Sequence, residues 1–355
     1  MKVTHFISAP ASGGAEVYVK DLSIEMSNLG HDVHIIFLYC ASEIGRDDAY
    51  ELEFLDELTN NNVSFSFIRK TSGRKLLSAV IDLREHVSKF KPDILHCHLY
   101  YALVYSFFIK KTRVIYTHHS INLKVPEFVY RIFDLKVSAY VGICHACTNR
   151  LSKISNNKVI HIDNAVSHSR IIPKIDYVYN EKLTILMVGR FVEPKNYSLI
   201  VDVVKLIENE NFLVKIAGEG PGFAEFKALI KNSNLNDKIH LLGNVNNISE
   251  HMNNADIFAM TSTWEGLPIS LIEATLSGLP TIVTNVGGCP EVAHAVLNGV
   301  VVDNFDAYEY ADSLSNLINS FELRSALSKN GIAYSERFKL ATAVERHMNL
   351  YSTVV

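Results

Sequence analysis

The chain has 355 residues, of which 48% are hydrophobic and 20% charged, and its formal net charge at pH 7 is -4. This length exceeds one typical domain and fits two, each with its own core. The composition is that of an ordinary globular protein, which excludes fibrous and disordered chains, and it has no basic bias that would make nucleic acid an expected partner.

Short β-branched or apolar runs alternate with helical patterns from the first residues onward, which is typical of βαβ units in a parallel sheet. The first set of strands is expected at residues 3–8, 33–39, 64–68, 94–96, 114–117, 139–143 and 159–162. The polar, proline-containing segment 167–182 is the expected interdomain linker. The second set of strands is expected at residues 184–188, 213–217, 239–242, 257–260, 281–284 and 300–302, followed by a helical pattern from residue 307 to the end. The pattern therefore predicts an α/β protein with two doubly wound parallel sheets.

The location expected from the sequence is cytoplasmic. The opening residues MKVTHFIS run directly into a strand pattern, so no secretory signal is visible. The longest apolar stretch, residues 99–109, falls short of the roughly 18 to 20 residues that span a bilayer. The odd number of cysteines, five, favours reduced thiols, and the lone CxxC at residues 144–147 is expected to be packed rather than to bind metal.

Glycine-containing loops follow several of the predicted strands, where ligands bind in doubly wound folds. The loop with Gly13 and Gly14 follows the first strand and opens a helix, which favours a phosphate or a sugar close to the backbone. The loop that starts at Gly189 carries Arg190 and Lys195, two cations suited to a diphosphate. The turn with Gly218, Glu219 and Gly220 follows the next strand and permits phosphate or base contacts. The loop with Gly13 and Gly14, taken alone, is also consistent with a plain turn.

Two glutamates, Glu265 and Glu273, are separated by seven residues in the stretch TSTWEGLPISLIEA. Gly266, Leu267 and Pro268 indicate that the first glutamate lies on a loop and the second in the first turns of a helix. An ionised carboxylate accepts two hydrogen bonds from a vicinal diol, so sugars and riboses fit such a pair. The alternative is that both glutamates are solvated surface residues.

His118 and His119 follow the predicted strand VIYT, where an imidazole would point toward a ligand crevice. The alternative is that they are packing residues, since the chain has 15 histidines.

With these motifs, the sequence resembles the retaining glycosyltransferases of family four, which have the two-Rossmann-domain architecture called GT-B. The matching motifs span almost the whole chain. They are the GGAE loop at 13–16, His118, Asn164-Ala165-Val166, Gly189-Arg190 with Lys195, the turn at 218–221, the pair Glu265 and Glu273, and residues 287–291. Ala165 and Ser167 depart from the glycine and aspartate that the family often has there.

The resemblance implies two Rossmann-like domains that face each other across a cleft. Residues 1–166 would form the acceptor-binding domain, 183–335 the nucleotide-sugar-binding domain, and 336–355 a C-terminal helix that packs back on the N-terminal domain. It implies a hexosyltransferase-type enzyme that acts on a saccharide, an undecaprenyl-diphosphate-linked or a lipid-core acceptor in capsule, O-antigen, lipopolysaccharide or exopolysaccharide assembly. The donor would be a nucleotide sugar, a UDP-sugar first and a GDP-sugar as the alternative, with no other cofactor.

The resemblance also assigns roles to residues. Arg190 and Lys195 would hold the diphosphate, Glu273 the ribose hydroxyls and Glu265 the donor sugar. His118 would contact the donor sugar and help to stabilise developing charge, so that the implied catalytic residues are His118, Glu265, Arg190 and Lys195. No metal is implied, in agreement with the lack of an Asp-x-Asp motif in the sequence. The full set implied to bind the nucleotide sugar is Gly13, Gly14, Gly189, Arg190, Lys195, Gly218, Glu219, Gly220, Glu265, Gly266, Leu267, Pro268 and Glu273.

Two other functions remain open on the same residues. A nucleotide-sugar epimerase on this scaffold would also bind a diphosphate and a ribose, and it would convert a sugar nucleotide without any acceptor. A non-catalytic sugar-nucleotide binder is disfavoured, because an idle site has no need for that cluster of charges.

Basic residues beside aromatic stretches in the N-terminal half predict peripheral binding to an anionic membrane surface, such as the inner face of the cytoplasmic membrane. The alternative is that residues 99–109 are simply a core helix. The cations concerned are Arg69, Lys70, Arg74, Lys75, Lys110, Lys111, Arg113, Lys124 and Arg131.

Overall fold

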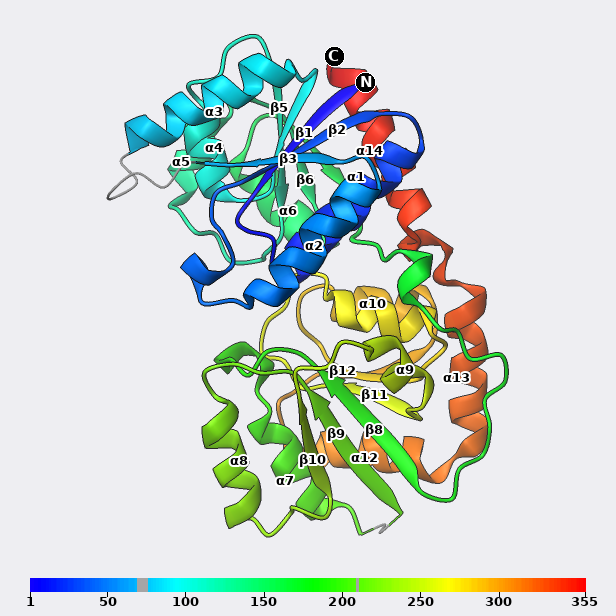
Figure 1. Cartoon of the computed structure of the whole chain (residues 1–355). Helices are drawn as coiled ribbons and strands as arrows, with labels where there is room; N and C mark the ends of the chain where they lie inside the picture. The colour runs from blue at the N-terminus through cyan, green and yellow to red at the C-terminus, as the bar shows by residue number, and fades with distance from the viewer. Residues whose placement is uncertain (69–75, 209–210) are drawn as a thin grey trace. The chain divides into compact units, whose positions relative to one another are not determined.

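The computed structural model describes residues 1–68, 76–208 and 211–355. The chain divides into two compact units, each built around one sheet (Figure 1). The first unit consists of Met1–Ala165 and Lys339–Val355, and the second of Val166–Phe338.

The first unit contains a seven-stranded sheet in which every neighbouring pair is parallel, in the order β3-β2-β1-β4-β5-β6-β7. Its central strands are buried, as expected for a sheet covered on both faces, and they include the buried polar residues Thr4, His5 and His96 beside apolar ones. The predicted strands are confirmed to within one or two residues. Their bounds are β1 (Lys2–Ile7), β2 (Asp32–Phe37), β3 (Ser64–Phe67), β4 (Ile94–Cys97), β5 (Arg113–His118), β6 (Val137–Gly142) and β7 (Lys158–His161).

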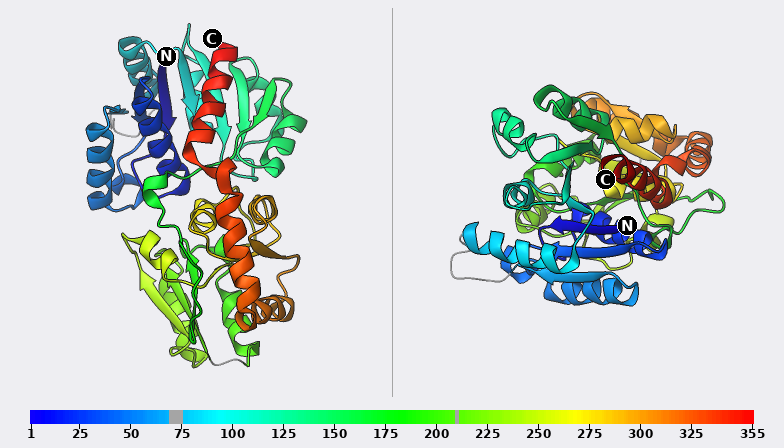
Figure 2. Two further views of the ribbon diagram at one scale, coloured as in Figure 1. Left: turned by 90° about the vertical axis from the view of Figure 1, so that its right-hand side faces the viewer. Right: turned by 90° about the horizontal axis from the view of Figure 1, so that it is seen from above.

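Helices cover both faces of this sheet, and the last helix of the chain packs beside the first, as Figure 2 shows. The return of the C-terminal helix to the first unit is thereby confirmed. The predicted apolar stretch 99–109 contains only a short helix, α4, with buried Ala102 and Leu103 and a half-exposed Tyr101. The helices are α1 (Gly14–Asn28), η1 (Ser42–Ile44), α2 (Asp48–Asn60), α3 (Leu76–Phe90), α4 (Tyr100–Ser106), α5 (Glu127–Phe133), α6 (His145–Ile154) and α14 (Leu340–Val354).

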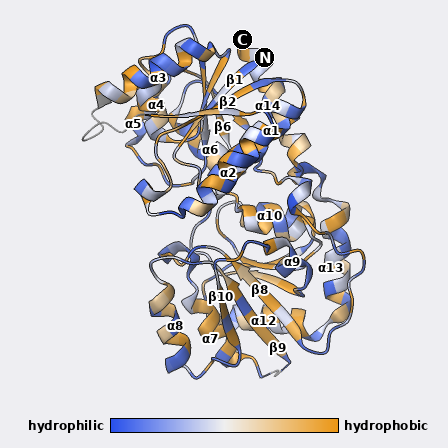
Figure 3. Cartoon of the chain, viewed as in Figure 1, coloured by the Kyte–Doolittle hydropathy of each residue, from blue (hydrophilic) through white to orange (hydrophobic). Residues whose placement is uncertain are grey.

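The second unit contains a six-stranded parallel sheet in the order β10-β9-β8-β11-β12-β13. Its strands are strongly hydrophobic in Figure 3, whereas its helices present mixed faces. The strands are β8 (Leu183–Val188), β9 (Phe212–Ala217), β10 (Ile239–Gly243), β11 (Ile257–Met260), β12 (Thr281–Thr284) and β13 (Gly299–Val302). The helices are η2 (His168–Arg170), η3 (Glu193–Lys195), α7 (Ser198–Leu206), α8 (Phe223–Asn232), α9 (Ile248–Asn253), α10 (Ile269–Leu276), α11 (Cys289–Ala295), α12 (Ala307–Asn319), α13 (Phe321–Ala333) and η4 (Ser335–Phe338).

The segment between the two sheets is bonded to the second unit. The Lys174 N–H donates to the carbonyl of Ser277 at 3.0 Å, directly after α10. The Tyr177 hydroxyl donates to the backbone oxygen of Asp256 at 2.7 Å, and Asn180 donates to the carboxylate of the same residue at 2.7 Å. The polar segment therefore follows a defined path along this unit.

Two expectations from composition can be compared with the structure. In the described ranges, no helix combines the length and the apolarity needed to cross a bilayer. All five cysteines belong to the described part and carry free thiols. In the CxxC sequence, the Cys144 sulfur accepts the N–H of Cys147 at 3.4 Å and thereby caps the start of α6.

Candidate functional site

The loops that follow β8 and β9 pack directly on each other in the second unit. The Gly189 N–H donates to the carbonyl of Ala217 at 3.0 Å, and the Gly218 N–H donates to that of Gly243 at 2.7 Å. A β-carbon at Gly218 would lie 2.0 Å from the Gly189 carbonyl oxygen, so only glycine fits there. The predicted glycine loops thus meet at the carboxyl edge of the sheet, where parallel sheets bind ligands.

Glu219 and Gly220 belong to this loop contact. The carbonyl of Glu219 accepts the N–H of Phe191 at 3.0 Å, and the Phe191 carbonyl accepts the N–H of Gly222 at 3.0 Å. The buried Phe191 ring packs on Tyr197, with ring centroids 4.5 Å apart. A rigid apolar base therefore supports the loop that carries the two predicted cations.

Lys195 and Glu265 form an ion pair that joins the β8 and β11 loops. Lys195 Nζ lies 2.6 Å from Glu265 Oε1, and the Ser262 hydroxyl donates to the same oxygen at 2.7 Å. Both charged side chains are largely buried, at 18% and 13% exposed. Burial and the nearby Glu265 charge raise the pKa of Tyr197, whose hydroxyl donates to the Gly189 carbonyl at 2.9 Å.

The loop of Glu265 is fixed on two sides. Toward the β8 loop, the Thr263 N–H donates to the carbonyl of Pro194 at 2.8 Å. Toward the β12 loop, the Gly288 N–H donates to the carbonyl of Gly266 at 2.7 Å. Gly287, at a φ of 56°, approaches so closely that a β-carbon would lie 2.0 Å from the Glu265 carbonyl oxygen. The position of Glu265 therefore depends on both neighbouring loops.

Glu273 lies on α10, as predicted, and deeper than Glu265. Pro268 caps this helix, and the buried Leu267 anchors the loop before it. The Glu273 side chain is 5% exposed and forms an ion pair with Arg170 of the segment before β8. Arg170 was not predicted from the sequence, because it lies in the polar segment taken for a linker.

Arg190 is exposed on the same loop as Lys195. Arg190, Lys195 and Glu265 thus lie on loops that follow strands of this sheet, and Glu273 lies on α10, the helix that follows the Glu265 loop. Such a set can bind a diphosphate through its cations and a diol through a carboxylate.

The first unit carries the predicted glycine loop and the strand-end histidines. Gly13 precedes α1, which starts at Gly14, and the Ser8 hydroxyl donates to the Glu16 carboxylate at 2.5 Å beside it. His118 ends β5, is 2% exposed, and its Nδ1 lies 3.0 Å from the Tyr116 hydroxyl. Its Nε2 has no hydrogen-bond partner among the described residues. Burial, followed by the charge of Lys124, lowers the pKa of His118 to about 4, so the imidazole is neutral at pH 7.

His119 belongs to a chain of hydrogen-bonded imidazoles in the first unit. Its Nε2 lies 3.0 Å from His98 Nδ1, and His98 Nε2 lies 2.9 Å from His5 Nδ1. His96 contacts the hydroxyls of Tyr351 at 2.6 Å and of Thr117 at 2.7 Å. One potential metal-ligand atom from each of His5, His96 and His98 lies within 4.8 Å of the others. The hydrogen bonds already engage both nitrogens of His96 and His98, so we interpret the cluster as a packed polar network.

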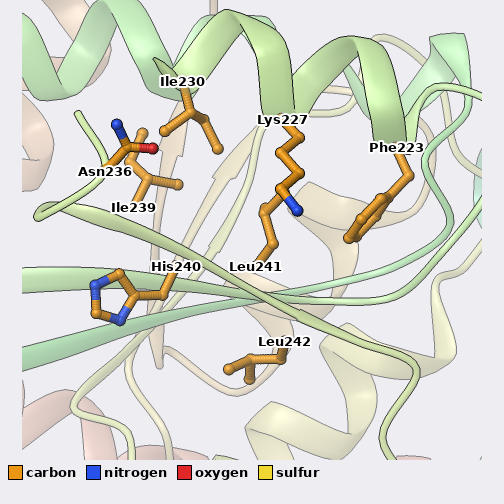
Figure 4. A pocket seen from close by; sticks show the side chains of 8 residues that line it. All are labelled: Phe223, Lys227, Ile230, Asn236, Ile239, His240, Leu241 and Leu242. Atoms are coloured by element: carbon orange, nitrogen blue, oxygen red, sulfur yellow. The ribbon is translucent and has the colours of Figure 1, made fainter. Parts of the chain in front are cut away.

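One surface hollow of the second unit lies apart from the predicted residues. It lies between α8 and β10 and has a volume of about 420 Å³ (Figure 4). Its lining includes Phe223, Lys227 and His240 and none of the predicted site residues.

Two family models match the chain in succession. The model described as Glycosyltransferase Family 4 matches residues 12–170, and that described as Glycosyl transferases group 1 matches residues 170–334. N-acetyl-alpha-D-glucosaminyl L-malate synthase of Bacillus anthracis is 24% identical, over 98% of this chain and 95% of that protein. The amylovoran biosynthesis glycosyltransferase AmsD of Erwinia amylovora is 26% identical, over 88% of each chain.

Solved structures share the fold. HepE of Anabaena, solved in complex with UDP-glucose, superimposes with a TM-score of 0.82 at 16% identity, over 99% of this chain and 100% of that one. At this identity the likeness concerns the fold, which is the GT-B arrangement of two Rossmann-like parallel-sheet domains. Since the two family models together extend from residue 12 to residue 334, the chain belongs to the glycosyl transferases group 1, or glycosyltransferase family 4, and is a nucleotide-sugar glycosyltransferase.

Proposed function

We propose that this protein is a retaining glycosyltransferase that moves a sugar from a nucleotide diphosphate sugar to a saccharide or lipid-linked acceptor during surface-polysaccharide assembly. The observation that carries the proposal is that Arg190, Lys195 and Glu265 lie on strand-end loops of the second unit and Glu273 on α10, the helix that follows the Glu265 loop. Family membership supports the transferase chemistry, and these four residues supply the groups that such a donor requires.

Arg190 and Lys195 are proposed to hold the diphosphate. Negative charge grows on the leaving diphosphate as the bond to the sugar breaks, and fixed cations in a partly buried site stabilise that charge. Lys195 is 18% exposed and already lies against a carboxylate, so its ammonium is held in place. Two such cations can do the work of a divalent ion, which supports a reaction without a metal.

Glu273 is proposed to bind the ribose hydroxyls and Glu265 the donor sugar. The Glu265 carboxylate is held by Lys195 and Ser262 at hydrogen-bond distance, so it can accept hydroxyl donors in a defined direction. The backbone of the 218–220 turn and of residues 266–268 would line the nucleotide, where small side chains leave room for close contact.

Retention is proposed to proceed on one face of the sugar. The departing phosphate oxygen takes the proton of the acceptor hydroxyl while the acceptor oxygen bonds to the anomeric carbon, and the bond to the diphosphate breaks. The transition state resembles an oxocarbenium ion, and no covalent sugar-enzyme bond forms.

His118 is proposed to contact the donor sugar. Its neutral ring and its buried Nε2 suit a hydrogen bond to a sugar hydroxyl. Gly13 and Gly14 are proposed to approach the same substrate through their backbone.

A UDP-sugar is the proposed donor, with a GDP-sugar as the alternative. The complex of HepE with UDP-glucose supports the first choice. The name of AmsD supports a polysaccharide pathway, and the name of the Bacillus anthracis relative adds L-malate to the acceptors worth testing.

The proposal is tested by incubating the protein with UDP-, GDP- and ADP-sugars, with and without acceptors. Transfer or slow hydrolysis of one donor, with release of the nucleoside diphosphate, supports it. Conversion of the sugar nucleotide into an isomer without any acceptor would instead support the epimerase alternative.

Peripheral binding to an anionic membrane is proposed through the first unit. On α5 and just after it, Phe128, Ile132 and Leu135 form one stripe at positions i, i+4 and i+7 and are 66%, 47% and 82% exposed. Exposed cations of the same unit supply the charge attraction. They are Lys110, Lys111, Arg113, Lys124 and Arg131, whereas Arg69, Lys70, Arg74 and Lys75 lie outside the described residues.

A further inference from the structure

The ion pair between Arg170 and Glu273 involves a carboxylate that is almost fully buried. Arg170 Nη2 contacts Glu273 Oε1, and the two side chains are 29% and 5% exposed. Burial disfavours the charged form of a carboxylate, and a neighbouring guanidinium favours it. Arg170 therefore favours the ionised form of Glu273 in this environment.

The backbone of Arg170 is held in place around η2. The Val166 N–H donates to the carbonyl of Phe338 at 3.1 Å, before the arginine, and the Lys174 N–H donates to that of Ser277 at 3.0 Å, after it. Asn253 Nδ2 donates to the carbonyl of Ile172 at 3.2 Å. Because Ser277 follows directly after α10, the segment and the helix that carries Glu273 are joined at two points, the ion pair and this backbone bond.

We propose that Arg170 is a positioning residue for ribose recognition, because it keeps the Glu273 carboxylate ionised and fixes its orientation toward the two hydroxyls of the donor. This inference rests on the proposed role of Glu273. A carboxylate has about four acceptor positions, so an arginine at Oε1 is compatible with a diol at the same group. A planar guanidinium also restrains the plane of the carboxylate, which a point charge does not.

The Arg170→Gln variant distinguishes a role of Arg170 in ribose recognition from a purely structural role. Without the guanidinium, part of the Glu273 population becomes protonated as the pH falls, and a protonated carboxyl accepts hydroxyl donors less well. Nucleotide binding should then depend on pH in the variant, being weaker at pH 6 than at pH 8. A purely structural arginine would lower stability and leave the preference for ribose unchanged.

The chain offers a matched control. Arg346 Nη1 lies 3.2 Å from Asp163 Oδ2, and that carboxylate is 2% exposed, so this pair also joins a partly exposed arginine to a buried acid. It belongs to the first unit, outside the proposed nucleotide site. Arg346→Gln should therefore change stability without changing the preference between ribo- and deoxyribonucleotides.

The experiment measures the affinities of UDP, GDP and ADP and of their 2′-deoxy forms by titration calorimetry at pH 6 and pH 8. The parent should prefer the ribo form of its nucleotide by about 10- to 100-fold, the value of a charge-assisted hydrogen bond. Arg170→Gln should reduce this preference to about 2-fold at pH 6 and recover part of it at pH 8. Arg170→Lys keeps the charge but not the planar guanidinium. Its preference for the ribo form should lie between that of the parent and that of Arg170→Gln.

The outcomes separate this inference from the proposed function. A folded Arg170→Gln protein with the parental preference at both pH values would overturn the role of Arg170 and leave the function standing. A parent that binds a nucleotide diphosphate without any preference for ribose would overturn the role of Glu273, and the inference with it. If Arg170→Gln does not fold, Arg170→Lys decides, because the parental preference in that variant would contradict the need for a planar guanidinium.

Discussion

Acidification from pH 7 to pH 5 should destabilise the first unit, because its buried histidines are neutral in the folded chain. Burial lowers the pKa of His5 to about 3, and the same cause, with a contribution from His5, lowers that of His347 to about 3. Their pKa in the unfolded chain is about 6.5. The unfolded state therefore binds more protons below pH 6.5, and stability is lost as the pH falls from there toward 3.

The size of the effect is worked out for His5 and His347, two buried histidines whose pKa falls to about 3. His5 and His347 are 0% and 1% exposed, so at pH 5 each contributes a loss of about 2 kcal/mol. Together they remove about 4 kcal/mol, a large part of the roughly 5 to 15 kcal/mol that stabilises a typical domain. His96 and His98, whose pKa burial also lowers, act in the same direction.

The loss of stability on acidification is measured by urea unfolding at pH 7 and pH 5 in the parent and in the His347→Gln variant. The control is His240→Gln, which changes an exposed histidine of the second unit. Far-UV circular dichroism follows both units, and the fluorescence of Trp264, the single tryptophan, follows the second. The loss of stability between the two pH values should be about 2 kcal/mol smaller in His347→Gln than in the parent. Equal losses in the two proteins would refute the reasoning.

Three further predictions concern the site and the surface. Arg190→Ala and Lys195→Ala should each lower turnover by about 10²- to 10³-fold while leaving the fold intact, and parental rates in both would contradict the diphosphate assignment. Gly287→Ala, which places a methyl group 2.0 Å from a backbone oxygen of the neighbouring loop, should cost about 1 to 3 kcal/mol in urea unfolding and weaken nucleotide binding. Phe128→Glu and Arg131→Glu should each reduce co-sedimentation with anionic vesicles at low salt, and vesicle binding that is unaffected by both changes would exclude this surface.

Much of the fold was predictable because buried parallel strands are short β-branched or apolar runs that alternate with helical patterns along the chain. Each predicted strand has a counterpart in β1 to β13, and the two sheets follow from the order of those runs. The loop residues of the second unit were predictable for a related reason. The carboxyl ends of parallel strands lie at one edge, so Lys195 and Glu265, 70 residues apart, meet as an ion pair.

The partners of the predicted residues were not predictable from the sequence. They lie in distant segments whose sequence patterns indicate a linker, a strand or a helix and not a functional site. Arg170 lies 103 residues before Glu273, in a polar stretch that is typical of a linker. The histidine network joins β1, β4 and β5 with α14, and the bond between His96 and Tyr351 spans 255 residues. Single histidines in apolar strands carry no sign of such a network, so only the sheet register and the returning helix bring them together.

The central claim is that the second unit binds a nucleotide diphosphate sugar through Arg190, Lys195, Glu265 and Glu273. It is tested most directly by thermal stabilisation with UDP-, GDP- and ADP-sugars, measured in the parent and in the Lys195→Ala protein. One donor class should raise the melting temperature of the parent in proportion to the logarithm of its concentration, and the shift should shrink strongly in the variant. Equal shifts in both proteins, or no shift with any nucleotide sugar, would contradict the account.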